Sequence, residues 1–250
     1  MESYLPVVNV IPNEIRQGRN VYEGYQRGWG VQCSDLRGKV LADPLYQEAF
    51  AVAADRTIMS EENRINLFLL LRFYLGNIPF GHIVEFGSYR GGSAIFLAFV
   101  AKKLYPGMKV FAMDTFEGMP KTDKNIDAHD EGDFADTDVE SLQKRIDELQ
   151  LYNLVLVKGL FETTSVKALN HAGLISLAHI DCDIASAVKY SYEVVKPHMV
   201  EGGYIVFDDA TVSSCIGATE IVEDFLIRRD GLNSEQIWPH FVFRAFTNPA

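Results

Sequence analysis

The sequence predicts an α/β fold in which a mostly parallel sheet carries helices on both faces. Short apolar runs of strand type alternate with helical runs between residues 82 and 229, and this alternation is typical of parallel sheets. A glycine-rich turn joins the first of these strands to a helix, as in nucleotide-binding α/β sheets. Four of the strands end at carboxylates, on the sheet edge where ligands bind in this fold class.

The candidate strands are five β-rich runs followed by a terminal hairpin. The runs are His82–Gly87, Lys109–Thr115, Leu154–Lys158, Ser176–Asp181 and Gly203–Asp208, and the last strand is Phe241–Phe246. Gln236–Trp238 is expected to pair with this last strand, because no helix fits between the two. The predicted sheet then has seven strands, of which the final one runs antiparallel to the others.

Helices are expected where apolar residues recur at helical spacing. They cover Glu61–Leu75, Gly92–Leu104, Asp138–Leu149, Thr163–Ala172, Ile184–Pro197 and Ile216–Arg229. Ser60 is the expected N-cap of the first helix, and Gly76 and Pro79 end it. After the second strand, Lys121–Asp138 contains six aspartates; we expect this long polar loop to act as a lid or to be disordered.

Residues 1–55 differ from the rest of the chain. Prolines, glycines and aromatic residues are scattered through them, and strong periodicity is missing until Pro44–Asp55. We expect an extended N-terminal arm that packs on a partner subunit or covers the active site, with a poorly ordered tail as the alternative. A single catalytic domain over residues 56–250 follows, and the enzyme is expected to be a homo-oligomer.

The composition favours a small-molecule partner. A formal net charge of −11 argues against nucleic acid, which would favour a basic face. No apolar run approaches the roughly 20 residues that cross a membrane, and the first residues lack the pattern of a secretory signal. Cys33, Cys182 and Cys215 are odd in number and widely spaced, which indicates reduced thiols and a cytoplasmic location.

The glycine-rich turn favours a cofactor without a pyrophosphate. In Gly87-x-x-x-Gly91-Gly92, Tyr89 stands where the dinucleotide fingerprint has the glycine that lets the backbone approach a pyrophosphate. S-adenosylmethionine is the common cofactor of this kind. Asp114 ends the next strand, where an acidic residue accepts hydrogen bonds from ribose hydroxyls. The alternative for Asp114 is a cap or turn aspartate.

Carboxylates at the ends of the fourth and fifth strands predict a metal site. Asp181, Asp183, Asp208 and Asp209 converge if these two strands are neighbours. Like charges that close together raise one another's pKa, and a divalent cation removes the penalty. Oxygen-only ligation selects Mg²⁺, Ca²⁺ or Mn²⁺. Which three of the four bind the metal is open from spacing alone, and the alternative is helix caps with solvated charges.

Other polar residues give weaker signals. His129 lies in the acidic loop and is a possible base or substrate contact, whereas His179 is expected to be a core imidazole beneath the site. Cys182 and Cys215 are expected to be inert; Cys182 has no His or Lys nearby in sequence to activate it.

Four motifs together resemble the macrocin O-methyltransferase family, whose members methylate sugar hydroxyls using S-adenosylmethionine and Mg²⁺. They are Glu85–Ser93, Asp114–Pro120, Asp181–Asp183 and Gly202–Asp209, and the resemblance spans about Met59 to Arg244. It implies a Rossmann-like class I methyltransferase fold over residues 56–250. The chain departs from the family at the fourth strand, where Ala185 and Ser186 replace a Tyr and a Glu.

The resemblance also implies roles for individual residues. Glu85, Gly87 and Ser93 would hold the amino-acid end of the cofactor and Asp114 its ribose, with Ser88, Tyr89, Thr115 and Phe116 completing the cofactor site. Asp181, Asp208 and Asp209 would bind Mg²⁺, and Asp181 would also be the general base. Asp183 competes with Asp181 for these roles, and its position favours a cap of the following helix.

The expected reaction is therefore methyl transfer to a hydroxyl of a sugar in a natural product or glycoconjugate. A catechol-type aromatic diol is the alternative acceptor. A nicotinamide-dependent oxidoreductase or epimerase is an alternative of another class, against which Tyr89 counts. A non-catalytic scaffold that retains only the fold is the third alternative.

Overall fold

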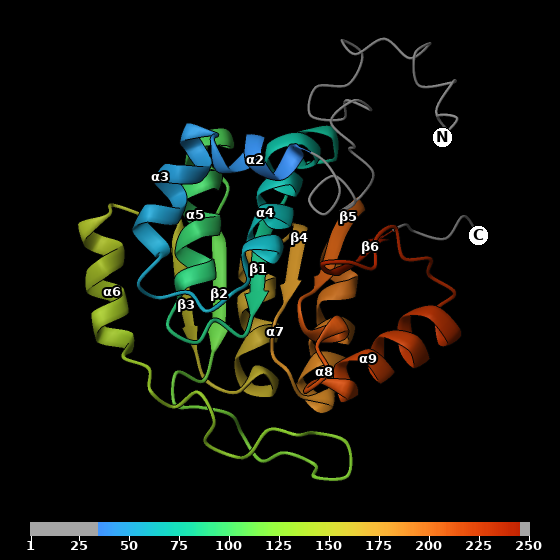
Figure 1. The fold of residues 1–250 in the computed structure, drawn as a ribbon. Coiled ribbons are helices and arrows are strands. Elements are labelled where there is room, and N and C mark those ends of the chain that lie inside the picture. Colours follow the sequence, from blue (N-terminus) through green and yellow to red (C-terminus); the bar gives the residue numbers. More distant parts are fainter. Residues whose placement is uncertain (1–34, 246–250) are drawn as a thin grey trace, which may run out of the picture.

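A computed structural model describes residues 35–245 and shows a six-stranded sheet of order β3-β2-β1-β4-β5-β6 (Figure 1). Strands β1 to β5 are parallel, and β6 runs antiparallel to β5. The strands are β1 (His82–Phe86), β2 (Val110–Asp114), β3 (Leu154–Lys158), β4 (Ile175–Ile180), β5 (Met199–Phe207) and β6 (Phe241–Ala245). The predicted α/β class and the antiparallel last strand are confirmed.

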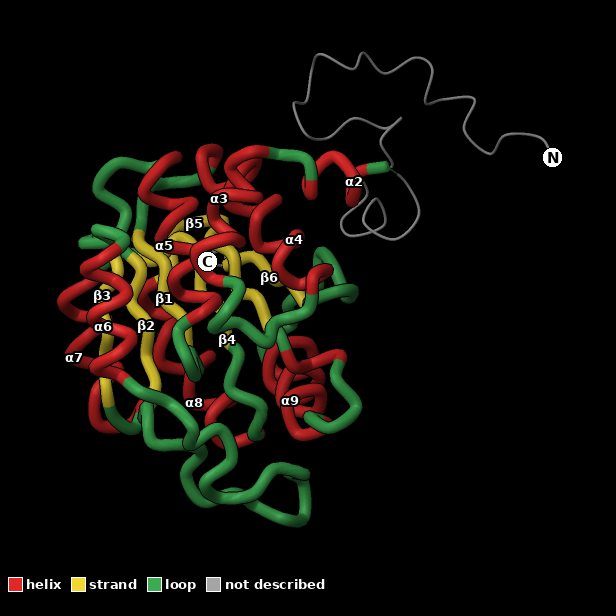
Figure 2. The backbone as a smooth tube through the Cα atoms, turned by 60° about the vertical axis from the view of Figure 1, so that its left-hand side comes forward, coloured by secondary structure: helices red, strands yellow, loops and turns green. Residues whose placement is uncertain are grey.

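Helices cover both faces of this sheet (Figure 2). They are α2 (Leu36–Leu41), α3 (Pro44–Ala53), α4 (Glu61–Leu69), α5 (Gly92–Leu104), α6 (Val139–Glu148), α7 (Phe161–Ala172), α8 (Ala185–Val195) and α9 (Ile216–Ile221). Helix α4 continues as a π-helical turn, Leu70–Tyr74, and a 3-10 turn, Leu75–Asn77, while α9 continues as a π-helix, Val222–Arg229. Short 3-10 turns cover Lys196–His198 and Asp209–Thr211. The Ser60 hydroxyl accepts from Asn63 N at 3.1 Å, as the predicted N-cap of α4.

Two apolar layers bury the sheet on both sides, because successive strand residues point to opposite faces. In β1, Ile83 packs with α3, α4 and α5, whereas Val84 and Phe86 pack with α8 and α9. This two-sided burial explains why the strands read as continuous apolar runs rather than alternating ones. None of the helices within residues 35–245 has the length and apolar character of a membrane span.

The predicted seventh strand is wrong for the described residues. Gln236 forms an isolated antiparallel bridge with Val242 and is not part of a strand. Its side chain turns inward and donates from Nε2 to Asn66 Oδ1 at 2.9 Å. Proline cannot donate to a strand ladder, so Pro239 gives the segment no N–H with which to extend the pairing. The hairpin therefore supplies one sheet strand, β6.

The described part of the predicted arm, residues 35–55, is helical and packs on the domain. Asp43 accepts from Leu45 N at 2.8 Å and caps α3, which begins at Pro44. The Tyr46 ring contacts Phe96 of α5 edge-on, with ring centroids 5.7 Å apart. Apolar burial on α5 holds these residues in the helical layer, so they are not extended as expected. An arm of residues 1–34 lies outside the described residues and stays a prediction.

The acidic loop between β2 and α6 lies beyond the carboxyl ends of the strands, at the bottom of Figure 1. Asp127 anchors it: this buried side chain accepts from Ala185 N at 2.8 Å. It thereby caps α8, whose own N-cap residue, Ile184, makes no side-chain cap. The long loop is present where the sequence predicted it, and Asp127 is one of the residues that fasten it to the domain; its role as a lid stays a prediction.

Replacing Asp127 by Ala is expected to lower the free energy of unfolding by about 1 kcal/mol, the usual cost of a lost cap. Proteolysis within the acidic loop should become faster, because the anchor is gone. Asp130→Ala is the matched control, since Asp130 is exposed and pairs on the surface with Lys124, at 2.6 Å. Urea denaturation measures the first effect; equal losses in both variants would remove Asp127 as the anchor.

Candidate active site

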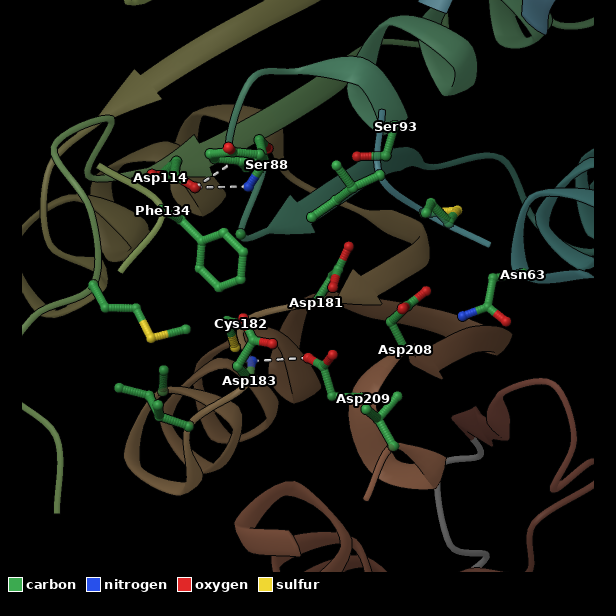
Figure 3. Close-up of a pocket in the computed structure, with 18 of the residues that line it drawn as sticks. Asn63, Ser88, Ser93, Asp114, Phe134, Asp181, Cys182, Asp183, Asp208 and Asp209 are labelled. Carbon is green, nitrogen blue, oxygen red and sulfur yellow. Dashed lines mark hydrogen bonds between the residues drawn. The ribbon is translucent and has the colours of Figure 1, made fainter. Parts of the chain in front are cut away.

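A cavity of about 480 Å³ lies at the carboxyl ends of the strands, where the sequence predicted the site. Its walls are the turn after β1, the ends of β2, β4 and β5, and the acidic loop (Figure 3). Most of the predicted site residues line it: Gly87, Ser88, Tyr89, Ser93, Asp114, Thr115, Asp181, Asp208 and Asp209. Glu85 and Phe116 are buried and do not line it.

The glycine-rich turn is built against the end of β4. Gly87 has φ +87°, and a Cβ there would lie 1.7 Å from the backbone oxygen of Asp181. Only glycine tolerates both the left-handed backbone and this close approach. The turn that would face a cofactor is therefore in direct contact with the segment that carries Asp181.

Asp114 holds the same turn from the other side. Its Oδ2 accepts from Ser88 N and Tyr89 N, both at 2.8 Å, and its Oδ1 accepts from Phe116 N at 2.6 Å. Asp114 therefore does act as a turn aspartate, which was the alternative to its role at the ribose. The Thr115 hydroxyl also lies 3.4 Å from Oδ1, but it donates its proton to Gly118 O at 2.6 Å. Because a carboxylate has about four acceptor positions, the three backbone bonds leave one for a ribose hydroxyl.

A buried hydrogen-bond chain runs beneath the cavity. Glu85 accepts from the Ser88 hydroxyl at 2.6 Å and contacts His179 Nδ1 at 3.1 Å. The other imidazole nitrogen of His179 lies 3.3 Å from Asp208 Oδ1. Burial opposes protonation of His179, but hydrogen bonds to Asp208 and Glu85 raise its pKa to about 9. The Glu85 carboxylate lies beneath the turn and supports Ser88, and its side chain does not line the cavity.

The chain continues through two residues that sequence reasoning missed. His240 Nε2 lies 2.7 Å from Asp208 Oδ1, and Asn66 Nδ2 lies 2.9 Å from His240 Nδ1. Because Asn66 Oδ1 accepts from Gln236, its amide nitrogen faces His240, and His240 therefore donates to Asp208. Burial opposes the ionised form of Asp208, yet these imidazole contacts lower its pKa and keep it an anion.

Asp181, Asp208 and Asp209 bring carboxylate oxygens within 4.8 Å of one another. Figure 3 shows the three side chains directed into one space between the ends of β4 and β5. Burial, followed by the charges of Asp208 and Asp209, raises the pKa of Asp181. Burial and the charges of Asp183 and Asp208 raise the pKa of Asp209. The cluster therefore carries a surplus of negative charge that a cation would relieve.

Asp183 does not cap α8, so that prediction is wrong. Its N–H donates to Asp209 Oδ2 at 2.8 Å, and its backbone has φ +59°. This left-handed conformation turns the side chain away from the helix axis, toward His129 and Cys215. The cap position is taken by Asp127 instead.

The remaining walls come from the acidic loop, which the sequence singled out, and from a rim of residues that it did not. From the acidic loop, Phe134 lines the cavity and packs edge-on against Tyr89, with ring centroids 5.2 Å apart. Tyr89 and Arg90 both bond to Asp136, which ties the end of the loop to the glycine-rich turn. On the opposite side, Asn63 and Trp238 complete the wall. Trp238 is one-third exposed, and no motif marked either residue.

The known proteins described next, to which this chain is similar, are methyltransferases. The model of the family described as Macrocin-O-methyltransferase (TylF) matches residues 70–234. The chain is 25% identical, over 195 residues and 74% of each protein, to 8-demethyl-8-(2,3-dimethoxy-alpha-L-rhamnosyl)-tetracenomycin-C 4'-O-methyltransferase of Streptomyces olivaceus.

Solved structures show the same fold. The O-methyltransferase NovP has a TM-score of 0.65 at 18% identity, covering 77% of this chain and 83% of its own. CalS11, a calicheamicin methyltransferase, has a TM-score of 0.62 at 20% identity, covering 80% and 91%. The predicted class I methyltransferase fold and the predicted resemblance are confirmed. Because the family model spans well over half of its length, this chain belongs to the macrocin O-methyltransferase family.

Proposed function

We propose that this enzyme transfers a methyl group from S-adenosylmethionine to a sugar hydroxyl of a glycosylated small molecule, with Mg²⁺ bound at the site. One observation carries the proposal: the Asp181–Asp208–Asp209 cluster and the glycine-rich turn face the same cavity. A cofactor turn and an all-oxygen cation site side by side suit metal-assisted O-methylation.

The cofactor would supply an electrophilic methyl group at this edge of the sheet. Gly87, Ser88 and Tyr89 offer backbone that approaches a ligand closely, and Ser93 adds a hydroxyl at the start of α5. Asp114 and Thr115 would face the ribose, because they line the cavity at the end of β2. Phe116 belongs to the core and supports this position through its N–H.

The acidic cluster fits Mg²⁺ by its donor set. Asp181, Asp208 and Asp209 offer only oxygens, and burial with mutual repulsion raises the pKa of Asp181 and of Asp209. Mg²⁺ held there would lower the pKa of an acceptor hydroxyl and orient it. Asp181 is the proposed general base, since it lies between the cofactor turn and the cluster and can take the hydroxyl proton.

The acceptor site is proposed for a sugar rather than a flat aromatic diol. Asn63, Glu62, Ser186 and Thr211 give the wall polar groups that suit sugar hydroxyls. The exposed apolar residues Ile58, Val212 and Trp238 stand beside them and suit the aglycone to which the sugar is attached. The curated relative acts on a rhamnosyl group, which supports the same acceptor class. A homo-oligomer and a cytoplasmic location stay predictions from the sequence.

The test is methyl transfer measured with and without divalent metal. With a rhamnosyl glycoside as acceptor, turnover should disappear in excess EDTA and return with Mg²⁺ or Mn²⁺, because the carboxylate cluster cannot hold the acceptor oxygens without a cation. A catechol of similar size is the control acceptor. Full turnover after exhaustive chelation would contradict the proposed role of the metal. Methylation of the catechol but not of the glycoside would show that the acceptor is an aromatic diol rather than a sugar.

Binding of the demethylated cofactor tests the other half of the site. Calorimetry with S-adenosylhomocysteine should give about one site per chain, and Asp114→Asn should weaken it by about 1–3 kcal/mol. The variant loses one acceptor for the ribose and loosens the turn that Ser88 N and Tyr89 N make with Asp114. Unchanged affinity would exclude Asp114 from the cofactor site.

A further inference from the structure

A second cluster of possible metal ligands lies next to the carboxylate cluster and shares no residue with it. It consists of His129 from the acidic loop, Asp183 from the segment after β4, and Cys215 just before α9. We propose that these three side chains bind a divalent cation of the Zn²⁺ class, which fastens the acidic loop over the cavity. This site goes beyond the proposed methyl transfer and does not depend on it.

The ligand atoms already have the spacing of a zinc site. His129 Nε2 lies 3.6 Å from Asp183 Oδ1 and 3.8 Å from Cys215 Sγ, and that sulfur lies 3.5 Å from the same carboxylate oxygen. Zinc bonds of about 2.0–2.3 Å in a tetrahedral arrangement put neighbouring ligand atoms about 3.3–3.6 Å apart. After a small inward movement of His129, the three ligand atoms would occupy three of the four corners of a tetrahedron around the ion.

The second nitrogen of His129 has the partner that a zinc-bound histidine typically has. Nδ1 lies 3.2 Å from Asp133 Oδ2, and this oxygen also accepts from Asp130 N at 3.0 Å. Metal-binding histidines usually donate their other N–H to a carboxylate, which fixes the tautomer and directs the free nitrogen at the metal. Asp133 thus leaves His129 Nε2 as the free donor atom, facing Asp183 and Cys215.

Charge and ligand type select the cation. The Asp183 side chain is one-fifth exposed and Cys215 is buried. Asp183 binds a metal as the carboxylate and Cys215 as the thiolate. A divalent ion would stabilise both anions and balance their charges. Sulfur and imidazole nitrogen favour Zn²⁺, whereas the neighbouring oxygen-only cluster favours Mg²⁺.

The three ligands come from three separate segments, so a bound cation would link the acidic loop to the domain. His129 is packed behind Phe134, which lines the cavity, with ring centroids 5.6 Å apart. Asp183 and Cys215 belong to the domain on which the loop rests. A cation that joins them would hold Phe134 in place and restrict opening of the loop.

Cobalt titration of the full-length protein tests the site directly. With Mg²⁺ present in excess to occupy the carboxylate cluster, one equivalent of Co²⁺ should produce the near-ultraviolet charge-transfer band of a cobalt thiolate. Cys215→Ser should abolish the band, and Asp133→Asn should weaken Co²⁺ binding about 10-fold or more. Cys182→Ser is the matched control and should keep the band, since Cys182 is buried nearby but lies against Ser191 rather than a histidine.

Limited trypsin digestion tests the consequence for the loop. Cleavage after the exposed Lys121 and Lys124 should slow in Zn²⁺ for the unmodified protein and for Cys182→Ser, and stay fast for Cys215→Ser. Absence of the cobalt band, or a band that survives Cys215→Ser, would overturn the site. A band without protection would overturn the fastening of the loop. Methyl transfer with Mg²⁺ alone is measured separately, so failure of the zinc site and failure of the proposed function are distinguishable.

Discussion

Replacing Asp181 by Asn is expected to lower kcat by about 10²–10⁴-fold, the usual worth of general acid–base catalysis. The variant should remain folded and should still bind S-adenosylhomocysteine. Asn has nearly the same shape as Asp, but its side chain is neutral and cannot take a proton from the acceptor. It also removes one charged oxygen donor from the carboxylate cluster, so Mg²⁺ affinity should fall in the same variant.

The large loss of kcat is expected because Asp181 contacts both parts of the proposed site. Its backbone N–H donates to Phe86 O at 2.9 Å, which continues the pairing of β4 with β1, and its backbone oxygen packs on Gly87. Its carboxylate points into the space shared with Asp208 and Asp209. The same residue therefore touches the glycine-rich turn through its backbone and faces the proposed cation site through its side chain.

Single-turnover kinetics and Mn²⁺ binding measured on one protein sample check both parts of this expectation. Asp138→Asn is the control: Asp138 also lies at the end of the acidic loop, but its side chain caps α6 by accepting from Ser141 N at 2.9 Å. That variant should keep its turnover. If Asp181→Asn stays active while Asp183→Asn is folded, binds cofactor and is inactive, the roles of the two aspartates are reversed.

Local sequence signals were enough for most of the fold. The helix Gly92–Leu104 has the predicted limits, and Ser60 is the predicted N-cap of α4. Apolar runs buried on both faces and a capping hydroxyl are properties of a few neighbouring residues, so they can be recognised without the tertiary structure. The edge of carboxylates was also predictable, because all parallel strands end on the same side of the sheet.

Contacts between distant segments were not predictable. Asn66 and His240 are 174 residues apart and lie beneath the site, where polar residues can support a ligand without forming a motif. Asp183 lies just before α8 and was expected to cap it, but the cap comes from Asp127, 58 residues before Ala185. The path of the acidic loop decides which aspartate caps the helix. The residues next to α8 in the sequence do not indicate where that loop folds back.

The second large effect is expected for Gly87→Ala, which should lower the free energy of unfolding by on the order of 4 kcal/mol or more. The new Cβ would lie 1.7 Å from the Asp181 backbone oxygen, 2.7 Å from its carbonyl carbon and 3.2 Å from Cys182 Cα. All three atoms belong to the backbone, so no side chain can rotate away. Relief requires the ends of β1 and β4 to separate, which would also displace Asp181 from the carboxylate cluster.

Gly107→Ala is the control that distinguishes the clash with the Asp181 backbone from the strain of a left-handed backbone. Gly107 has φ +89°, nearly the same as Gly87, but a Cβ there meets nothing within 4 Å. It should therefore cost only about 1–2 kcal/mol for the left-handed conformation. Urea denaturation compares the two variants; where Gly87→Ala is too unstable to purify, its soluble yield beside that of Gly107→Ala gives the same ranking. Equal losses would mean that the end of β4 does not fill the space above Gly87, and the cofactor turn and Asp181 would then not be coupled through this contact.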